Sequence, residues 1–359
     1  MIPVSKPLLG KKEKEAVWRV LESGILAQGP RVAEFEKRFA EYIRVKYAVA
    51  TSSGTTALHL ALLAHGIKKG DEVITTPFTF IASSNAILYC GAKPVFVDIG
   101  EDFNINPDLI EKKITKKTKA ILPVHLFGYP ADMVKIMKIA KKYHLAVIED
   151  CCQAHGASIF GKKVGSFGTG CFSFYPTKNM TTGEGGMITT NNKQIAERAK
   201  LLRNHGMKIR YYHDVLGFNF RMTDIAAAIG LEQLKKLEKF NKKRIGNANY
   251  LNKNIKTKGI ILPKVKIGYR HVFHQYTIRV TPQCPKSREE LIRILNDNGI
   301  GSAIYYPLPV YHQKPYVRLS CKNRFPVTEK CTREVLSIPV HPSLTKRDLN
   351  KIVSVLNNL

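Results

Sequence analysis

The 359-residue sequence lacks the patterns that mark disulfide scaffolds, zinc sites and membrane spans. It has seven cysteines, an odd number, and no CxxC pair, so neither a disulfide framework nor a zinc site is expected. No segment reaches the roughly 20 apolar residues of a membrane span, and the N-terminus has no apolar core of signal-peptide type. We therefore expect a cytoplasmic protein without a metal site.

Acidic residues are scarce relative to basic ones: 28 Asp and Glu stand against 57 Lys and Arg, which gives a formal net charge of +29. Such an excess can indicate a nucleic-acid partner. The lysines, however, occur as scattered doublets, and no arginine-rich arm, zinc-finger spacing or aromatic RNA-binding strand accompanies them. The charge indicates solvated lysine faces that would attract a phosphorylated small molecule, and nucleic acid is not expected as the main ligand.

The chain also has no Ser-, Pro- or Gly-rich linker and no internal repeat. Its length exceeds that of one small core, and 44% hydrophobic with 24% charged residues is ordinary for a globular protein. We expect a large domain over residues 1–240 and a smaller C-terminal domain over 241–359. A long helix that continues toward Ile255 would carry the chain from one to the other.

What the first half does contain is a regular alternation of short apolar strands and helices. This alternation predicts parallel βαβ units in a doubly wound α/β sheet, with functional groups after the carboxyl ends of the strands. After Thr190 the pattern becomes mostly helical. The predicted strands are 47–50, 72–76, 94–98, 120–124, 145–148, 170–175 and 276–280, and the predicted helices include 81–90, one starting at Pro107, 131–143, 194–203, 287–298 and 346–356.

One stretch, from Leu145 to Thr190, brings an acid and a lysine together. Asp150 follows a buried strand at its carboxyl end. Pro176 stops the next strand, so Lys178 is presented on a loop beside the same sheet edge. The sequence thus predicts a crevice that holds both side chains.

Two further patterns each allow two interpretations. The hydroxyl- and glycine-rich turn from Thr51 to Thr56 precedes a helix, where it can bind a phosphate or serve as an ordinary N-cap. Cys151 and His155 can form a thiol nucleophile and its base, but this spacing is more typical of packing.

Six blocks in order resemble the sugar aminotransferases of the DegT/DnrJ/EryC1/StrS family. They are SGTTALHLAL, TPFTFIAS, PVHLFG, VIEDCCQAHGA, FSFYPTKNMTTGEGGMI and GFNFRMTDIAAAIGLEQL. The resemblance covers nearly the whole chain and is less specific in the C-terminal third. It implies fold type I of the pyridoxal-phosphate enzymes: a mostly parallel central sheet flanked by helices, plus a smaller α+β domain.

The resemblance also implies pyridoxal 5'-phosphate as the cofactor, with pyridoxamine 5'-phosphate as its intermediate form. Lys178 resembles the family's Schiff-base lysine, which also carries the proton, and Asp150 resembles the partner of the pyridine nitrogen. Gln153 matches a position near the phenolic oxygen. The remaining implied contacts are Gly54, Thr55 and Ser173 at the phosphate, Phe80 on the ring face, and Asn219 at the phosphate from a neighbouring subunit, which implies a homodimer.

Lys178 further favours transamination, because sugar dehydratases of this family carry histidine at that position. The implied reaction moves an amino group from L-glutamate to a keto group of a UDP- or dTDP-linked hexose for amino-sugar and cell-surface polysaccharide biosynthesis. His125, Tyr306 and His312 are candidates either for substrate contact or for structural roles. The alternatives are a dehydratase or synthase of the same family and a non-catalytic regulatory protein. The nucleotide, the hexose and the aminated carbon stay open.

Overall fold

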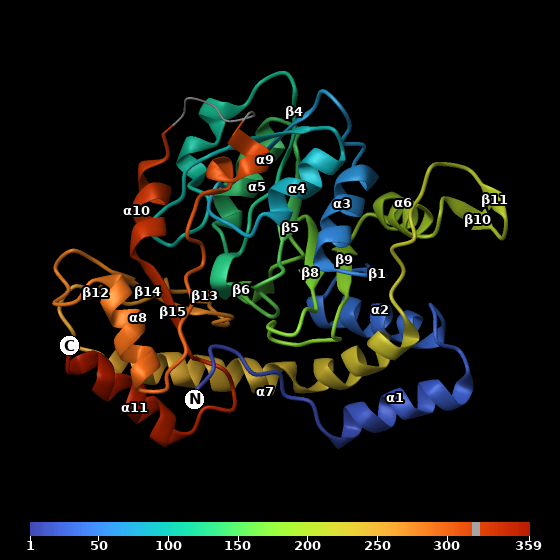
Figure 1. The fold of residues 1–359 in the computed structure, drawn as a ribbon. Coiled ribbons are helices and arrows are strands. Elements are labelled where there is room, and N and C mark those ends of the chain that lie inside the picture. The colour runs from blue at the N-terminus through green and yellow to red at the C-terminus, as the bar shows by residue number, and fades with distance from the viewer. Residues whose placement is uncertain (318–323) are drawn as a thin grey trace.

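The computed structural model describes residues 1–317 and 324–359, and its centre is a seven-stranded sheet with the order β1-β9-β8-β5-β4-β2-β3 (Figure 1). β9 runs antiparallel to both neighbours, and the remaining neighbouring strands pair in parallel. The mostly parallel α/β sheet predicted from the sequence is therefore confirmed. Its strands are β1 (Tyr47–Thr51), β2 (Glu72–Thr75), β3 (Lys93–Phe96), β4 (Thr118–Ile121), β5 (Ala146–Asp150), β8 (Thr169–Ser173) and β9 (Gly186–Thr190).

Successive residues of these strands enter two different cores, one on each face of the sheet. In β8, Cys171 shares a core with residues of α3 and α6, whereas Phe172 shares a core with residues of α2 and α7. Helices therefore cover both faces. They are α1 (Lys11–Ser23), α2 (Pro30–Ile43), α3 (Gly54–Ala64), α4 (Ala82–Tyr89), α5 (Met133–Lys142), α6 (Lys193–Arg203) and α7 (Asp224–Asn254). Within the described residues, no helix is long and apolar enough to cross a membrane.

The 31-residue helix α7 runs beneath both parts of the molecule (Figure 1). Leu231 and Leu237 belong to the large-domain core, and Ala248 and Leu251 belong to a separate C-terminal core. The change of core thus falls inside a continuous helix, between Leu237 and Ala248. The predicted domain boundary at residue 240 falls within this helix and stays a prediction.

The smaller C-terminal part is built on an antiparallel three-stranded sheet, β12-β14-β15. Two segments depart from the expected division of the chain. Ile2 pairs with Ile300 and packs on the C-terminal core, and Cys331 of α10 packs in the large-domain core. The elements are β12 (Ile260–Ile261), β14 (Tyr276–Val280), α8 (Arg288–Asp297), η4 (Val310–His312), α9 (Lys314–Val317), α10 (Pro326–Glu334), β15 (Val335–Ile338) and α11 (Lys346–Asn357).

The predicted helix at Pro107 is absent from the structure as such, because two short 3-10 turns occupy the segment. Ile114 adopts an extended backbone with φ −74° and ψ 130°, since the chain must turn into β4 within a few residues. The minor elements are η1 (Pro107–Leu109), η2 (Glu111–Lys113), η3 (Leu126–Gly128), a hairpin of β10 (Met207–Ile209) and β11 (Tyr212–His213), and a small sheet of β6 (Ser158–Ile159), β7 (Lys162–Lys163) and β13 (Tyr269–Arg270).

A buried carboxylate fixes the end of β5. One oxygen of Glu149 accepts the backbone N–H groups of Phe167 and Gly168 at 2.9 and 2.8 Å. Its other oxygen accepts the N–H of Gly165 at 2.9 Å and contacts Nε2 of His125 at 3.2 Å. The carboxylate therefore ties the loop before β8 and the loop after β4 to β5.

His125 consequently has a structural role and not the substrate contact considered above. Its ring is completely buried, and Nδ1 accepts the N–H of Ala131 at 3.0 Å, so Nε2 carries the proton that it donates to Glu149. Neither nitrogen is left for a substrate. His125, Glu149 and Cys151 lie close enough to hold a metal ion, but these internal hydrogen bonds already engage the imidazole and the carboxylate.

Glu149→Gln is expected to lower the free energy of unfolding by roughly 2–4 kcal/mol, because the amide NH₂ would face backbone donors that now meet a carboxylate oxygen. Urea denaturation at matched cofactor content measures the change. Glu22→Gln, on the exposed face of α1, is the control and should change stability by less than about 0.5 kcal/mol. Equal stability of the two variants would contradict the anchoring role of Glu149.

Candidate active site

The predicted cofactor residues of one chain gather where the sheet ends in strands β5 and β8. Asp150 is the last residue of β5 and lies opposite Cys171 in the register, so the next residues of both strands leave the sheet side by side. Ser173 is the last residue of β8, and helix α3 begins at Gly54, next to it. The carboxyl edge of a parallel sheet is the expected position of a ligand site.

The start of α3 forms a cradle suited to a phosphate. Ser53 caps the helix by accepting the N–H of Thr56 at 3.1 Å, which leaves the N–H groups of Gly54 and Thr55 without an acceptor in the helix. A Cβ on Gly54 would lie 2.6 Å from Cβ of Ser173 and 2.9 Å from Sγ of Cys152. Only glycine therefore lets the helix approach β8 this closely. The turn is an N-cap whose free amides and helix dipole also suit an anion.

Asp150 is oriented by two donors from different segments. Its Oδ2 accepts the hydroxyl of Ser83 at 2.7 Å, and its Oδ1 accepts the N–H of Cys152 at 3.1 Å. The side chain is only 5% exposed. Each carboxylate oxygen retains a further lone pair, so Asp150 can still accept a ring N–H.

Lys178 lies on the loop after β8, partly buried, and interacts electrostatically with Asp150. Asn179 anchors this loop, because its side-chain amide donates to Oδ1 of Asn241 at 2.8 Å and to the carbonyl of Val272 at 3.1 Å. Burial lowers the pKa of the Lys178 amine, and neighbouring Cys152 and Asp150 oppose that shift. A lowered pKa increases the neutral fraction, which is the nucleophilic form.

Gln153, Tyr306 and Phe80 form one side of the crevice. The amide oxygen of Gln153 accepts the N–H of Phe127 at 2.8 Å, and its nitrogen donates to the Tyr306 hydroxyl at 3.0 Å. The rings of Tyr306 and Phe80 are 6.4 Å apart. Phe80 is 58% exposed, so it is not a core residue and its face is available to a ligand.

Two predicted residues are not part of this cluster. The side chain of Asn219 is exposed and makes no hydrogen bond within the described residues, although Ser52 N–H donates to the carbonyl of its neighbour Phe220 at 2.9 Å. His312 is exposed on η4, with its ring against Tyr311. Of the three substrate candidates, Tyr306 reaches this cluster through its hydroxyl, which accepts from Gln153. His125 meets Asp150 through its backbone N–H, which donates to the Asp150 carbonyl at 3.0 Å.

The structure assigns Cys151 and His155 to the core. His155 is completely buried between Phe172 and Phe174, and burial lowers its pKa to about 3. Burial also raises the pKa of Cys151 well above the usual thiol value. A neutral imidazole and a protonated thiol in the core are not a nucleophile and its base.

Sequence reasoning missed Ser83 as the partner of Asp150. The available signal was its position in TPFTFIAS, three residues after Phe80 at the start of a predicted helix, which puts both on one turn. Nor did it assign a role to Cys152, whose backbone N–H orients Asp150 and whose thiol adjoins the cradle.

Comparison with known proteins identifies the family. The model of the DegT/DnrJ/EryC1/StrS aminotransferase family matches residues 7–357. GDP-perosamine synthase from Caulobacter vibrioides is 40% identical, covering 100% of this chain and 98% of that protein. UDP-N-acetyl-3-dehydro-alpha-D-glucosamine 3-aminotransferase from Acidithiobacillus ferrooxidans is 41% identical, with 95% and 91% covered.

Among solved structures, the ntda protein of Bacillus subtilis with bound cofactor PMP superimposes with a TM-score of 0.89. It is 35% identical, and the match covers 98% of this chain and 82% of that one. The chain therefore belongs to the DegT/DnrJ/EryC1/StrS aminotransferase family and is a pyridoxal-phosphate-dependent aminotransferase.

Proposed function

We propose that this aminotransferase moves an amino group from L-glutamate to a keto group of a nucleotide-linked hexose, in the synthesis of amino sugars for cell-surface polysaccharides. The observation that carries the proposal is the position of Lys178 beside Asp150, at the crevice where α3 begins. A relative that acts on a UDP-linked sugar and one named for a GDP-linked product support the substrate class. They do not agree on the nucleotide.

The residues present fit pyridoxal phosphate. The free amides of Gly54 and Thr55, with the Ser173 hydroxyl, would hold the phosphate. Asp150, oriented by Ser83 and the Cys152 N–H, would accept the ring N–H. The remaining contacts would come from Phe80, whose exposed ring would cover one face, and from Gln153, which has an N–H left for the phenolic oxygen.

When bound, the cofactor supplies a protonated ring that withdraws electrons from the reacting carbon. The chain's own task is then to move one proton. Lys178 would take the proton from the donor carbon that is bonded to the nitrogen and give it to the cofactor carbon on the other side of that nitrogen, and the reverse order would serve the keto sugar. A lysine whose pKa is lowered by burial is suited to both directions, because neutral and protonated forms lie closer in free energy.

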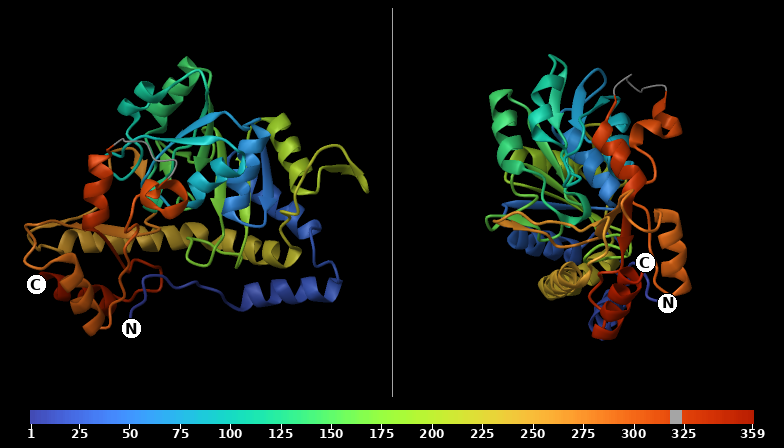
Figure 2. Two further views of the ribbon diagram at one scale, coloured as in Figure 1. Left: turned by 45° about the horizontal axis from the view of Figure 1, so that its top comes forward. Right: turned by 90° about the vertical axis from the view of Figure 1, so that its left-hand side faces the viewer.

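Asn219 would complete the phosphate site of a second copy. Its side chain is exposed. The adjacent hairpin of β10 and β11 projects from the body of the molecule (Figures 1 and 2). Ile209, Tyr211, Tyr212 and Leu216 of this region are 68–88% exposed. Such exposed apolar side chains are typical of an interface, which supports a homodimer with shared sites.

To test the reaction itself, the purified protein is first incubated with L-glutamate, which should convert its cofactor to the pyridoxamine form. UDP-, dTDP- and GDP-linked keto sugars are then added. We expect 2-oxoglutarate and the pyridoxamine form in the first step, and an aminated sugar in the second. Lys178→Ala should reduce the rate by about 10³-fold, because the proton carrier is lost, and Lys162→Ala, at an exposed position of β7, is the control. Bound cofactor without 2-oxoglutarate would instead favour a synthase, and a protein that binds no cofactor would refute the proposal.

Gly54→Ala tests the phosphate cradle. The added Cβ meets Ser173 and Cys152, so α3 must move away from β8 and the cofactor dissociation constant should rise on the order of tenfold, equivalent to about 1.4 kcal/mol. Equilibrium dialysis measures it. Gly246→Ala on α7 is the matched control, because a Cβ there has nothing within 4 Å. Unchanged cofactor affinity in Gly54→Ala would place the phosphate elsewhere.

Shared sites are tested by mixing two inactive proteins, Lys178→Ala and Asn219→Ala. In a hybrid dimer one site carries both changes and the other carries neither, so random mixing should restore about a quarter of wild-type activity. Assays after co-refolding measure the recovery. No recovery, with hybrids verified by mass, would show that Asn219 acts within its own chain.

A further inference from the structure

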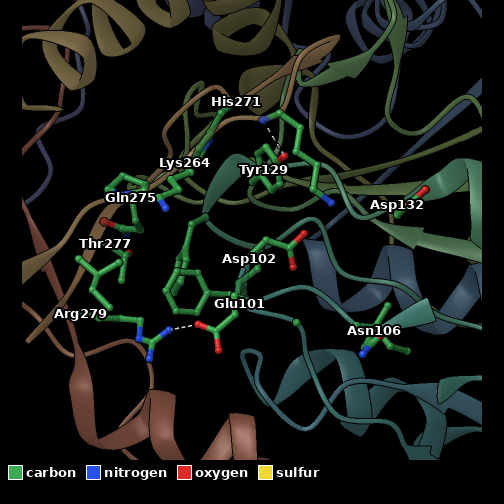
Figure 3. Close-up of a pocket in the computed structure, with 18 of the residues that line it drawn as sticks. Glu101, Asp102, Asn106, Tyr129, Asp132, Lys264, His271, Gln275, Thr277 and Arg279 are labelled. Atoms are coloured by element: carbon green, nitrogen blue, oxygen red, sulfur yellow. Dashed lines mark hydrogen bonds and ion pairs between the residues drawn. The ribbon is translucent and has the colours of Figure 1, made fainter. Parts of the chain in front are cut away.

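A cavity of about 610 Å³, separate from the cofactor crevice, lies between the large domain and the C-terminal part, beyond the ends of β3 and β4 (Figure 3). Loops of residues 100–108 and 126–135 form one wall, and residues 261–266 and 271–279 form the other. None of the proposed cofactor contacts lines it. Its volume is that of a site for a small molecule, and junctions between domains commonly carry such sites.

The charges in this cavity are balanced, although the chain as a whole is strongly basic. Glu101, Asp102, Asp108 and Asp132 line it together with Lys135, Lys264, Lys266 and Arg279, four acids against four bases. Across the whole chain, 57 basic residues stand against 28 acidic ones. The cavity is therefore enriched in acid relative to the rest of the protein.

Half of these charges already have a partner. Arg279 pairs with Glu101, as Figure 3 shows, and also with Glu334 at 2.8 Å. Lys135 pairs with Asp108 at 2.8 Å. These four side chains are engaged with one another or with Glu334, so they offer little free charge to a ligand.

The other half form no ion pair within residues 1–317 and 324–359. Asp102 and Asp132 are half-buried on the large-domain wall, and Lys264 and Lys266 are exposed on the opposite wall. Burial raises the pKa of Asp102, which the hydrogen bond from the Asn104 N–H and the charge of Lys266 oppose. Opposite charges on facing walls suit a ligand that carries both signs.

An occupant would also touch a residue that holds the cofactor crevice together. Phe127 lines the cavity, its N–H donates to Gln153 at 2.8 Å, and its carbonyl accepts the N–H of Gln275 at 3.2 Å. Phe127 has a φ of 57°, a strained backbone for a non-glycine residue, so a small displacement there is energetically significant. Gln153 in turn holds the hydroxyl of Tyr306.

We propose that this interdomain cavity is a second ligand site, for a small zwitterion whose cationic group meets Asp102 and Asp132 and whose anionic group meets Lys264 and Lys266. Its occupancy shifts Phe127 and thereby Gln153. The binding of a zwitterion is inferred from the cavity alone, whereas the shift of Gln153 rests on the proposed role of this residue at the cofactor. Free amino acids and aminated sugar phosphates share this chemistry.

Calorimetric titration of the holoenzyme distinguishes these two sources. N-methyl-L-glutamate, a secondary amine that cannot donate its amino group, represents the amino acids, and glucosamine 6-phosphate represents the aminated sugars. Glutarate and glucose 6-phosphate are the matched probes without a cationic group. We expect one zwitterion to bind at millimolar concentration or below, and its matched probe to bind at least tenfold more weakly.

Variants place the binding in the cavity. Asp102→Asn and Lys266→Gln should each weaken binding of the zwitterion tenfold or more, whereas Asp297→Asn and Lys258→Gln, at exposed positions elsewhere, should leave it unchanged. Equal affinity in Asp102→Asn and wild type, or no binding of either zwitterion, would overturn the site. Calorimetry requires no turnover, so failure of the aminotransferase reaction would be recorded separately.

The predicted shift of Gln153 is tested by recording the absorption spectrum of the bound cofactor during the same titration. A saturable change with the calorimetric midpoint, abolished in Asp102→Asn, is expected. A bound zwitterion without any spectral change would overturn the link to Gln153 while leaving the site itself in place.

Discussion

The geometry of the crevice depends on the buried carboxylate of Glu149. Its two oxygens receive three backbone N–H groups and one imidazole N–H, from the loop before β8 and the loop after β4. Removing any donor would leave part of a buried charge unpaired, which is strongly destabilising, so the segments are held as one unit. Side chains alternate along a strand, and the next residue, Asp150, therefore points to the other side. Glu149 thus holds the scaffold, and its neighbour Asp150 is left for the proposed contact with the cofactor.

A single helical turn then carries two of the residues behind the proposed contacts to the cofactor ring. Phe80 presents an exposed face, and Ser83, whose N–H donates to the Phe80 carbonyl at 3.2 Å, orients Asp150. Stacking acts perpendicular to a ring, and a hydrogen bond to its nitrogen acts in its plane. Because both groups lie on one turn before and within α4, the two contacts cannot be adjusted independently. A substitution on this turn is therefore expected to disturb both proposed contacts together.

The sequence was sufficient for the alternating α/β architecture and for the meeting of Asp150 with Lys178, because both follow from strand ends in a parallel sheet. It was not sufficient where distant segments decide. The antiparallel direction of β9 leaves no local signal in GMITT. Helix α10 returns to the large domain because Asp98 accepts the N–H groups of Val327 and Thr328 at 3.0 Å, some 230 residues away in the chain. The burial of His125 likewise depends on Glu149, which no periodicity reveals.

If Gln153 responds to ligands in both places, the binding affinities of the cofactor crevice and of the interdomain cavity are thermodynamically coupled. The Phe127 N–H donates to Gln153, so the two residues would move together. A ligand in the cavity and a cofactor in the crevice that both favour the same position of this pair would then each strengthen the binding of the other. Helix α7 continues unbroken from one core to the other, which restricts rigid hinge motion. The connection between the crevice and the cavity therefore runs through the loop after β4, where the Phe127 N–H donates to Gln153. The strained backbone of Phe127 lies on that loop. Reciprocity then requires that a change at the cofactor crevice alter the affinity of the interdomain cavity by the same factor.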